Sequence, residues 1–152
     1  MNRYLALALF LAASFLAALP GGLLTDASWY VALGRPSWAP PGWLFGPVWT
    51  VLYVLIAVSG WLVWRRGGWA AQRIPLIAFG IQLALNCAWT PIFFGARQIG
   101  LALVVIGVLG VAIAATAALF WRVSRVAGGL MLPYLLWVSF ATTLNFAIWR
   151  LN

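Results

Sequence analysis

The sequence predicts an all-α membrane protein, a bundle of five transmembrane helices with one long loop between the first two. Charged residues make up 7% of its 152 positions and hydrophobic residues 66%, whereas a water-soluble domain devotes about a quarter of its positions to charged side chains. The mean hydropathy of +1.05 also favours a lipid environment. A chain of this length is expected to form one domain, residues 1–152.

Five apolar runs predict the helices, because each is near the roughly 20 residues that a helix needs to cross the hydrocarbon layer. The runs lie at about residues 4–24, 43–64, 74–94, 100–121 and 130–149, and they contain no Asp, Glu, Lys or Arg. They lack the alternating pattern of a membrane β-barrel strand, which leaves helices as the spanning structure. The first run has a second interpretation as a cleaved signal peptide, since Arg3 precedes it. Its length favours a retained helix.

The loop at about residues 25–42 contains several residues that interrupt helices. They are Gly34, Pro36, Pro40, Pro41 and Gly42. Proline lacks a backbone donor and both residue types favour turns, so the sequence excludes a long helix from this loop. The other connections are short.

The arginines predict the orientation in the membrane. One side of the predicted bundle carries Arg3, Arg65, Arg66, Arg73, Arg122 and Arg125. The other side carries Arg35, Arg97, Arg150 and the single acid, Asp26. Cytoplasmic loops are enriched in arginine, so we expect the N-terminus in the cytoplasm and the long loop outside. We expect a multi-pass protein of a bacterial cell membrane, with the choice between inner and outer membrane left open.

The residue types present exclude several chemistries and partners. The chain has no His, one acid and one cysteine, Cys87. It therefore lacks the ligands of a His and Cys metal site, the paired carboxylates of acid–base catalysis and a Ser-His-Asp triad. We expect no required cofactor. The net charge of +8 does not indicate a nucleic-acid partner, because the arginines lie between apolar runs and form no patch interleaved with polar residues.

The third predicted helix has a polar face and a face of small residues. Gln82, Asn86 and Thr90 follow at steps of four, so they share one face with Trp89 beside it. Polar side chains in a membrane helix are expected to face protein or a cavity. The small residues are Gly80, Ala84 and Ala88. They predict either packing inside the bundle or the seam of a homodimer. On the fourth helix, packing alone is predicted for Gly110, Ala114 and Ala118.

The fifth predicted helix repeats aromatic, small and amide residues at spacings of three and four. They are Tyr134, Trp137, Ala141, Leu144 and Asn145, and Pro133 is expected to kink the first turns. One interpretation makes this a ligand-binding face. The other makes Trp137 a core ring and Asn145 a group that hydrogen-bonds to a neighbouring helix.

Eleven tryptophans exceed the usual share of this residue. Some stand at the ends of runs, where an amphipathic ring prefers the headgroup level. They are Trp43, Trp61, Trp64, Trp121 and Trp149. Interfacial anchoring does not explain the tryptophans inside runs or in the long loop, which are Trp29, Trp38, Trp49, Trp89 and Trp137.

Several dense motifs follow one another along the chain. They are WYVALGRPSWAPPGWLFGPVWTVLY at 29–53, QLALN at 82–86 with Trp89, PIFFGARQ at 91–98, Pro133-Tyr134, Trp137 and FATTLN at 140–145. In these motifs the chain resembles the translocator protein family, also called tryptophan-rich sensory proteins or peripheral-type benzodiazepine receptors (TspO/MBR). The resemblance covers essentially the whole chain.

The resemblance implies a five-helix bundle, often a homodimer, whose central cavity is capped by the long loop. Members of the family bind porphyrins, including protoporphyrin IX, as well as sterols and synthetic ligands of the benzodiazepine type. By position, the matching cavity residues are Tyr30, Trp49, Asn86 and Trp137, and the matching ligand contacts on the last helix are Ala141 and Leu144. Some bacterial members promote light-dependent porphyrin breakdown, to which the resemblance links Trp49 and Trp137.

A porphyrin is a flat apolar disc with two propionates, so it needs ring faces, an amide donor and a cation. The residues expected to provide these groups are Trp38, Trp49, Trp89, Trp137, Asn86, Asn145 and Arg35, with Arg97 or Arg150 as alternatives to Arg35. Without His, a haem iron would depend on Cys87, Met131 or Tyr134. A metal-free porphyrin therefore fits better than haem.

Three classes of function follow. The first is a tetrapyrrole receptor, translocator or sensor, with the long loop as a gate. The second is a weak light-driven enzyme that degrades the bound porphyrin with Trp49 and Trp137, and the third is a scaffold whose partners lie elsewhere. Membrane lipid is an expected partner, but sterol binding is expected to be weak because Phe146 replaces the Tyr of the family's sterol motif before Arg150. Leu24, Tyr30 and Arg35 form a second, looser match to a sterol pattern.

Overall fold

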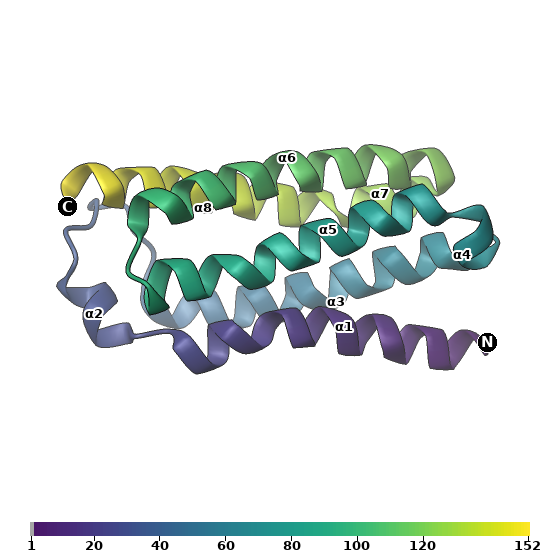
Figure 1. The fold of residues 1–152 in the computed structure, drawn as a ribbon, viewed down its shortest axis with the longest axis horizontal. Coiled ribbons are helices and arrows are strands. Elements are labelled where there is room, and N and C mark those ends of the chain that lie inside the picture. The colour runs from purple at the N-terminus through teal and green to yellow at the C-terminus, as the bar shows by residue number, and fades with distance from the viewer. Residues whose placement is uncertain (1) are drawn as a thin grey trace.

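The computed structural model describes residues 2–152, and most of them are helical. Within this part of the chain, five helical spans are long and apolar enough to cross a membrane. They are Arg3–Leu24, Gly42–Trp64, Arg73–Gly95, Ile99–Val123 and Arg125–Leu151. The spans lie along the long axis of the molecule (Figure 1). The predicted all-α membrane fold with five spanning helices is therefore confirmed.

Several spans consist of more than one helical element. The first half of the chain forms α1 (Arg3–Leu24), α2 (Ala27–Ala32), the 3-10 turn η1 (Gly42–Leu44) and α3 (Phe45–Trp64). The second half forms α4 (Gly68–Ala71), α5 (Arg73–Thr90), the π-helical turn η2 (Pro91–Gly95), α6 (Ile99–Val123), α7 (Arg125–Leu130) and α8 (Leu132–Leu151). The connection between α1 and α3 thus contains only the short helix α2 and the 3-10 turn η1, in agreement with its prolines and glycines.

The spans close into a ring. α1 packs against α3 and α5, α5 packs against α6, and α6 packs against α7 and α8, while α7 returns to α3. The N-terminus lies at the end of the bundle that carries α4 and α7, and the C-terminus lies at the opposite end beside α2 (Figure 1). The ring leaves an interior that side chains from every span can reach.

The half of the bundle near the N-terminus is tightly packed. The rings of Phe10 and Phe79 meet edge to face at 5.5 Å, and Phe79 stacks on Phe120 at 6.0 Å. Gly60 lies against the first two rings, because a Cβ atom there would be 2.8 Å from Phe10 and 2.9 Å from Phe79. The absence of a side chain at Gly60 therefore allows α1, α3 and α5 to meet.

Two prolines interrupt spans. The kink predicted at Pro133 is a break at Met131, where α7 ends and α8 begins. Pro133 has no backbone N–H with which to continue the hydrogen-bonding pattern of α7. Pro91 similarly begins the π-helical turn η2, in which Ala96 N donates to Pro91 O at 2.8 Å. The sequence did not predict this second change of helix type.

The faces of small residues lie on the outside of the bundle. Gly80 and Ala84 on α5 are exposed and Ala88 is half-buried. On α6, Ala114 and Ala118 are also exposed and Gly110 is half-buried, so these residues do not bring helices of the described chain into close contact, and their role in packing stays a prediction. α6 instead packs through a larger face that includes Ile106, Leu109 and Ile113.

Candidate functional site

A cavity of about 560 Å³ lies among the spans, and Ala27 and Tyr30 of α2 are part of its wall. All five spans and α2 contribute side chains to its wall. The predicted site residues that line it are Tyr30, Trp49, Asn86, Trp89, Trp137, Ala141, Leu144 and Asn145. The structure therefore brings together side chains as far apart in the sequence as Tyr30 and Asn145.

Asn86 is the centre of a buried polar group that joins three spans. Tyr53 Oη on α3 donates a hydrogen bond to Asn86 Oδ1 at 2.6 Å, and Asn86 Nδ2 donates to Tyr134 Oη on α8 at 2.9 Å. Asn86 is buried and Tyr134 is fully buried. Unpartnered polar groups are costly in a membrane interior, so this network stabilises the bundle as well as shaping the cavity.

Trp49 covers this network from α3. Its ring stacks on Tyr53 with centroids 5.4 Å apart and meets the edge of Tyr134 at 6.1 Å. Trp49 and Tyr53 lie one helical turn apart on the same face, which brings the two rings into contact. An aromatic surface therefore borders the Asn86 carboxamide on the cavity wall.

Trp89 forms a second wall and is held by a hydrogen bond. Its Nε1 donates to Asn145 Oδ1 on α8 at 3.2 Å, and Asn145 Nδ2 donates to Ile99 O at 3.1 Å. The Trp89 ring stacks on Phe93 at 4.9 Å. The interpretation of Asn145 as an interhelical hydrogen-bonding residue is therefore confirmed, and Asn145 also lines the cavity.

Trp137 and Tyr30 carry donors without protein partners. Trp137 Nε1 and Tyr30 Oη are buried, and neither has a hydrogen-bond partner among residues 2–152. The Phe45 ring contacts both residues, since its centroid lies 6.3 Å from that of the Tyr30 ring and 5.8 Å from that of the Trp137 ring. Both residues line the cavity, so a small rotation of either side chain would present a donor to a bound acceptor.

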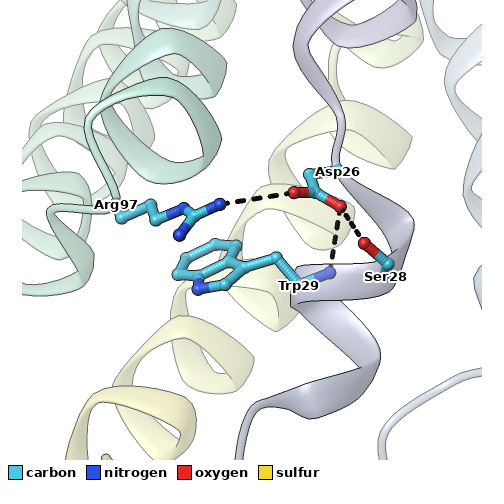
Figure 2. A network of polar contacts seen from close by, with 4 residues as sticks. All are labelled: Asp26, Ser28, Trp29 and Arg97. Atoms are coloured by element: carbon cyan, nitrogen blue, oxygen red, sulfur yellow. Dashed lines mark hydrogen bonds and ion pairs between the residues drawn. The ribbon is translucent and has the colours of Figure 1, made fainter.

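The helix α2 is fixed at its beginning by Asp26 (Figure 2). Asp26 Oδ1 accepts hydrogen bonds from Trp29 N at 3.0 Å and Ser28 Oγ at 2.6 Å, which caps the helix. Arg97 belongs to the connection before α6. Its Nη2 lies 3.5 Å from Asp26 Oδ2, and its guanidinium carbon lies 5.5 Å from the centroid of the Trp29 ring. The hydrogen bond from Ser28, followed by that from Trp29, lowers the pKa of Asp26 below its usual value. Asp26 is therefore ionised at neutral pH.

Tyr30 faces the cavity from α2 and carries Arg35 on its ring. The Arg35 guanidinium lies 5.1 Å from the Tyr30 ring centroid. Burial raises the pKa of Tyr30 above its usual value, so its hydroxyl keeps the proton that it would donate. Arg35 was expected in the cavity, but it is not among the side chains that line it. Its interaction with Tyr30 holds it beside the wall instead.

Trp38 also lies outside the cavity wall of the described chain. It is 48% exposed and packs edge to face against Phe140 at 5.9 Å. Phe140 belongs to the middle of α8, so the loop reaches this helix at Trp38. Trp38 thus contacts a neighbour of Trp137, since Phe140 and Trp137 lie 5.5 Å apart.

The sequence did not identify part of the cavity wall. The additional residues include Phe15, Ala18, Gly21 and Gly22 from α1, Phe45 and Tyr53 from α3, and Phe93 and Phe94 from η2. Tyr53 follows Trp49 by one helical turn, a signal that was available. The residues of α1 gave no such signal, because Ala and Gly at the end of an apolar run also fit plain lipid contact.

Comparison with known proteins places the chain in a family. The family model of TspO/MBR matches residues 6–150. The chain is 48% identical to the "Translocator protein" of Homo sapiens over 126 residues, which cover 82% of this chain and 75% of that protein. It is 41% identical to the "Tryptophan-rich sensory protein" of Cereibacter sphaeroides over 143 residues, covering 94% and 89%. It is 37% identical to "Protein CrtK" of Rhodobacter capsulatus over 149 residues, covering 95% and 91%. The chain, a multi-pass integral membrane protein, therefore belongs to the TspO/MBR family.

Proposed function

We propose that this protein binds a flat, apolar tetrapyrrole of the protoporphyrin IX kind and acts as its receptor, translocator or sensor in the membrane. The observation that carries the proposal is the cavity of about 560 Å³ walled by aromatic rings. Its volume lies within the roughly 300–1,000 Å³ typical of small-molecule sites. The names of the relatives, a translocator and a sensory protein, support the broader role.

Aromatic rings would stack on the ligand, and polar donors and a cation would bind its polar groups. Trp49, Trp89 and Trp137 provide faces on which a macrocycle can stack. Trp137 Nε1 and Tyr30 Oη provide donors that no protein group uses in the part of the chain that the structure describes. Arg35, on the Tyr30 ring, provides a cation for a propionate.

A metal-free ring suits these residues better than haem. Cys87, Met131 and Tyr134 are the replacements for a histidine ligand that the sequence predicts, and none of them lines the cavity. Of the tyrosines that do line it, Tyr53 donates its hydroxyl proton to Asn86, and burial keeps the hydroxyl of Tyr30 protonated, whereas a haem iron binds the phenolate. Tyr134 already accepts a hydrogen bond from Asn86. These positions support a ligand held by stacking and hydrogen bonds.

Quenching of tryptophan fluorescence by protoporphyrin IX tests the proposal. Purified protein is titrated with the pigment and compared with Asn86→Ala, Trp137→Phe and the control Trp149→Phe, which alters a ring outside the cavity. We expect weaker binding in the first two variants and unchanged binding in the control. Equal affinity in all four proteins would show that the pigment does not bind at this site.

A second candidate function is light-dependent degradation of the bound porphyrin. The position of Trp49 on the cavity wall favours it, because the excited pigment can accept an electron from this indole and pass it to dioxygen, which becomes superoxide. The indole radical cation then takes an electron from the macrocycle, and superoxide combines with the resulting porphyrin radical cation, so that dioxygen is the net oxidant and the indole is restored. Illumination of the complex with and without dioxygen, followed at the main absorption band of the porphyrin, tests this function. Loss of pigment at the same rate in Trp49→Phe and Trp137→Phe would exclude a role for these indoles.

We also propose a homodimer formed through Gly80, Ala84 and Ala88. The exposure of Gly80 and Ala84 supports it, and a Cβ atom at Gly80 would meet no described atom within 4 Å. Small residues on an outer face allow two helices to approach closely. Native mass spectrometry of Ala84→Leu is expected to show monomer, whereas the control Ala13→Leu, on the exposed face of α1, stays dimeric.

Sterol binding is the weakest of the expected activities. Phe146, which replaces the Tyr of the family's motif, is 50% exposed on α8 and has no hydroxyl to offer a sterol. We propose low sterol affinity for this chain, and expect Phe146→Tyr to increase the binding of a labelled sterol in nanodiscs.

A further inference from the structure

A second, smaller hollow lies at the end of the bundle opposite α2. It has a volume of about 240 Å³ and is lined by Leu62, Arg65, Arg66 and Ser124. Arg65 and Arg66 directly follow α3, and Ser124 lies between α6 and α7. None of these residues lines the cavity proposed to bind tetrapyrrole, so the hollow is a separate feature.

The two sides of the hollow are held in place by packing. Ser59 Oγ on α3 donates a hydrogen bond to Ala127 O on α7 at 2.7 Å, and both residues are fully buried. Gly128 lies against the end of α6, because a Cβ atom there would be 2.8 Å from the backbone of Trp121. The turn that carries Ser124 is therefore fixed relative to α3.

The polar groups of the hollow are oriented and have unused donors. The Arg65 guanidinium lies 4.7 Å from the ring centroid of Trp61, whose Nε1 donates to Arg3 O at 2.9 Å. Ser124 Oγ accepts a hydrogen bond from Ala127 N at 3.3 Å, so its own proton remains available. Two arginines and a serine thus line one small space.

No carboxylate neutralises these arginines. The single acid of the chain is Asp26, which pairs with Arg97 at the opposite end of the bundle. Arg65 and Arg66 are exposed, and four further arginines lie on the same side of the membrane. Guanidinium groups recognise the oxygens of phosphate through paired N–H donors, which makes an oxyanion the complementary ligand.

The position of Arg65 and Arg66 at the end of α3 indicates the source of this oxyanion. Trp61 and Trp64 stand just before the arginines, at the level where tryptophan prefers the membrane interface. The excess of arginine assigns this end to the cytoplasmic leaflet. Basic pockets between helices on that side attract anionic headgroups.

We propose that this hollow binds the phosphate of an anionic phospholipid. Arg65 and Arg66 donate N–H groups to the phosphate oxygens and Ser124 donates its hydroxyl proton. Leu62 contacts the glycerol or the first part of an acyl chain. The lipid thereby joins the end of α3 to the connection between α6 and α7.

Native mass spectrometry of the full chain released from nanodiscs tests the proposal. The nanodiscs contain phosphatidylcholine with a minor fraction of phosphatidylglycerol. We compare the wild type with R65Q/R66Q and with the control R73Q/R122Q, which removes the same charge at the same end outside the hollow. We expect the wild type to retain phosphatidylglycerol preferentially, and R65Q/R66Q to retain about tenfold less than the control.

The other outcomes distinguish a lipid site from diffuse surface charge and from a site for free phosphate. Equal loss in both double variants would overturn the proposal, because it would indicate diffuse surface charge. Binding of inorganic phosphate to protein in phosphatidylcholine nanodiscs, dependent on Arg65 and Arg66 and without retained phosphatidylglycerol, would overturn the lipid as the source. If R65Q/R66Q does not fold, R65K/R66K takes its place. Reduced retention despite unchanged charge would then support the site, and unchanged retention would overturn it.

Discussion

Asn152 and Gly34 exchange two hydrogen bonds across 118 positions of the chain. Gly34 N donates to Asn152 Oδ1 at 3.0 Å, and Asn152 Nδ2 donates back to Gly34 O at 3.0 Å. The same amide group also donates to Ile148 O at 2.7 Å, which fixes the side chain against α8. Because Asp26 pairs with Arg97 before α2, the loop is attached on both sides of Tyr30.

Removal of the attachment after α2 should loosen the loop. In Asn152→Ala both hydrogen bonds to Gly34 are lost, and since they are exposed we expect ligand dissociation to accelerate only a few-fold. Stopped-flow displacement of protoporphyrin IX measures this rate. Asn2→Ala, at the other end of the bundle, serves as the control, and equal rates in the two variants would contradict a role for the loop in release.

Acid should weaken the attachment before α2. The pKa of Asp26 is lowered from 3.8, so its interactions contribute fully above that value and are lost as the pH falls through the lower pKa of the folded protein. We therefore expect the dissociation rate to stay constant down to about pH 5 and to rise below pH 3.8. Asp26→Asn should dissociate faster at neutral pH and lose this acid-dependent rise. A similar rise in Asp26→Asn would assign it to another group.

The network around Asn86 should contribute to stability as well as binding. Asn86→Leu leaves the hydroxyls of Tyr53 and Tyr134 without their partner in a buried environment, at a cost of about 2–4 kcal/mol. Unfolding in mixed detergent measures this loss. Tyr53→Phe in the Asn86→Leu background should recover part of it, because it removes one unpartnered hydroxyl. Without such recovery, the hydrogen bonds would not be the source of the effect.

Substitutions of Trp89 and Trp137 should differ in their effects on the stability of the protein and on its affinity for porphyrin. Trp89→Phe removes a hydrogen bond to Asn145 and should lower the free energy of unfolding by about 0.5–1.5 kcal/mol. Trp137→Phe removes a donor that has no partner in the described structure, so stability should hardly change while porphyrin affinity falls. Thermal unfolding and fluorescence titration of both variants test this contrast, and identical profiles would refute it.

A methyl group at Gly60 should separate helices that the structure holds in contact. Gly60→Ala places a Cβ atom 2.8 Å from Phe10 and 2.9 Å from Phe79, and such overpacking typically costs about 1–3 kcal/mol. Gly107→Ala is the matched control, since no described atom lies within 4 Å of a Cβ there. Unfolding midpoints of the two variants measure the difference. Equal midpoints would show that this contact adapts without cost.

The spans and the inward polar face could be predicted because each depends on local pattern. Length and hydropathy identify a spanning helix, and the step of four that aligns Gln82, Asn86 and Thr90 is visible in the sequence. In the structure Gln82 and Asn86 are buried and Thr90 lines the cavity. The burial of polar groups away from lipid is a strong constraint, which is why this inference succeeded.

The loop positions could not be predicted because they depend on contacts distant in sequence. Arg35 stacks on Tyr30, and Trp38 packs against Phe140, a residue of the last span. Nothing local distinguishes these arrangements from side chains turned into the cavity. The role of a face of small residues is open in the sequence for a related reason, since Ala114 fits a helix contact and a lipid contact equally well.

Because all five spans contribute to the cavity wall, the protein can bind its ligand only when all five helices are in place. Phe15 belongs to the first span to emerge from the ribosome and Leu144 to the last, yet both border the same space. A chain that has inserted four of its helices has no complete pocket. Occupancy by a pigment would therefore mark, and stabilise, only those molecules whose insertion is complete.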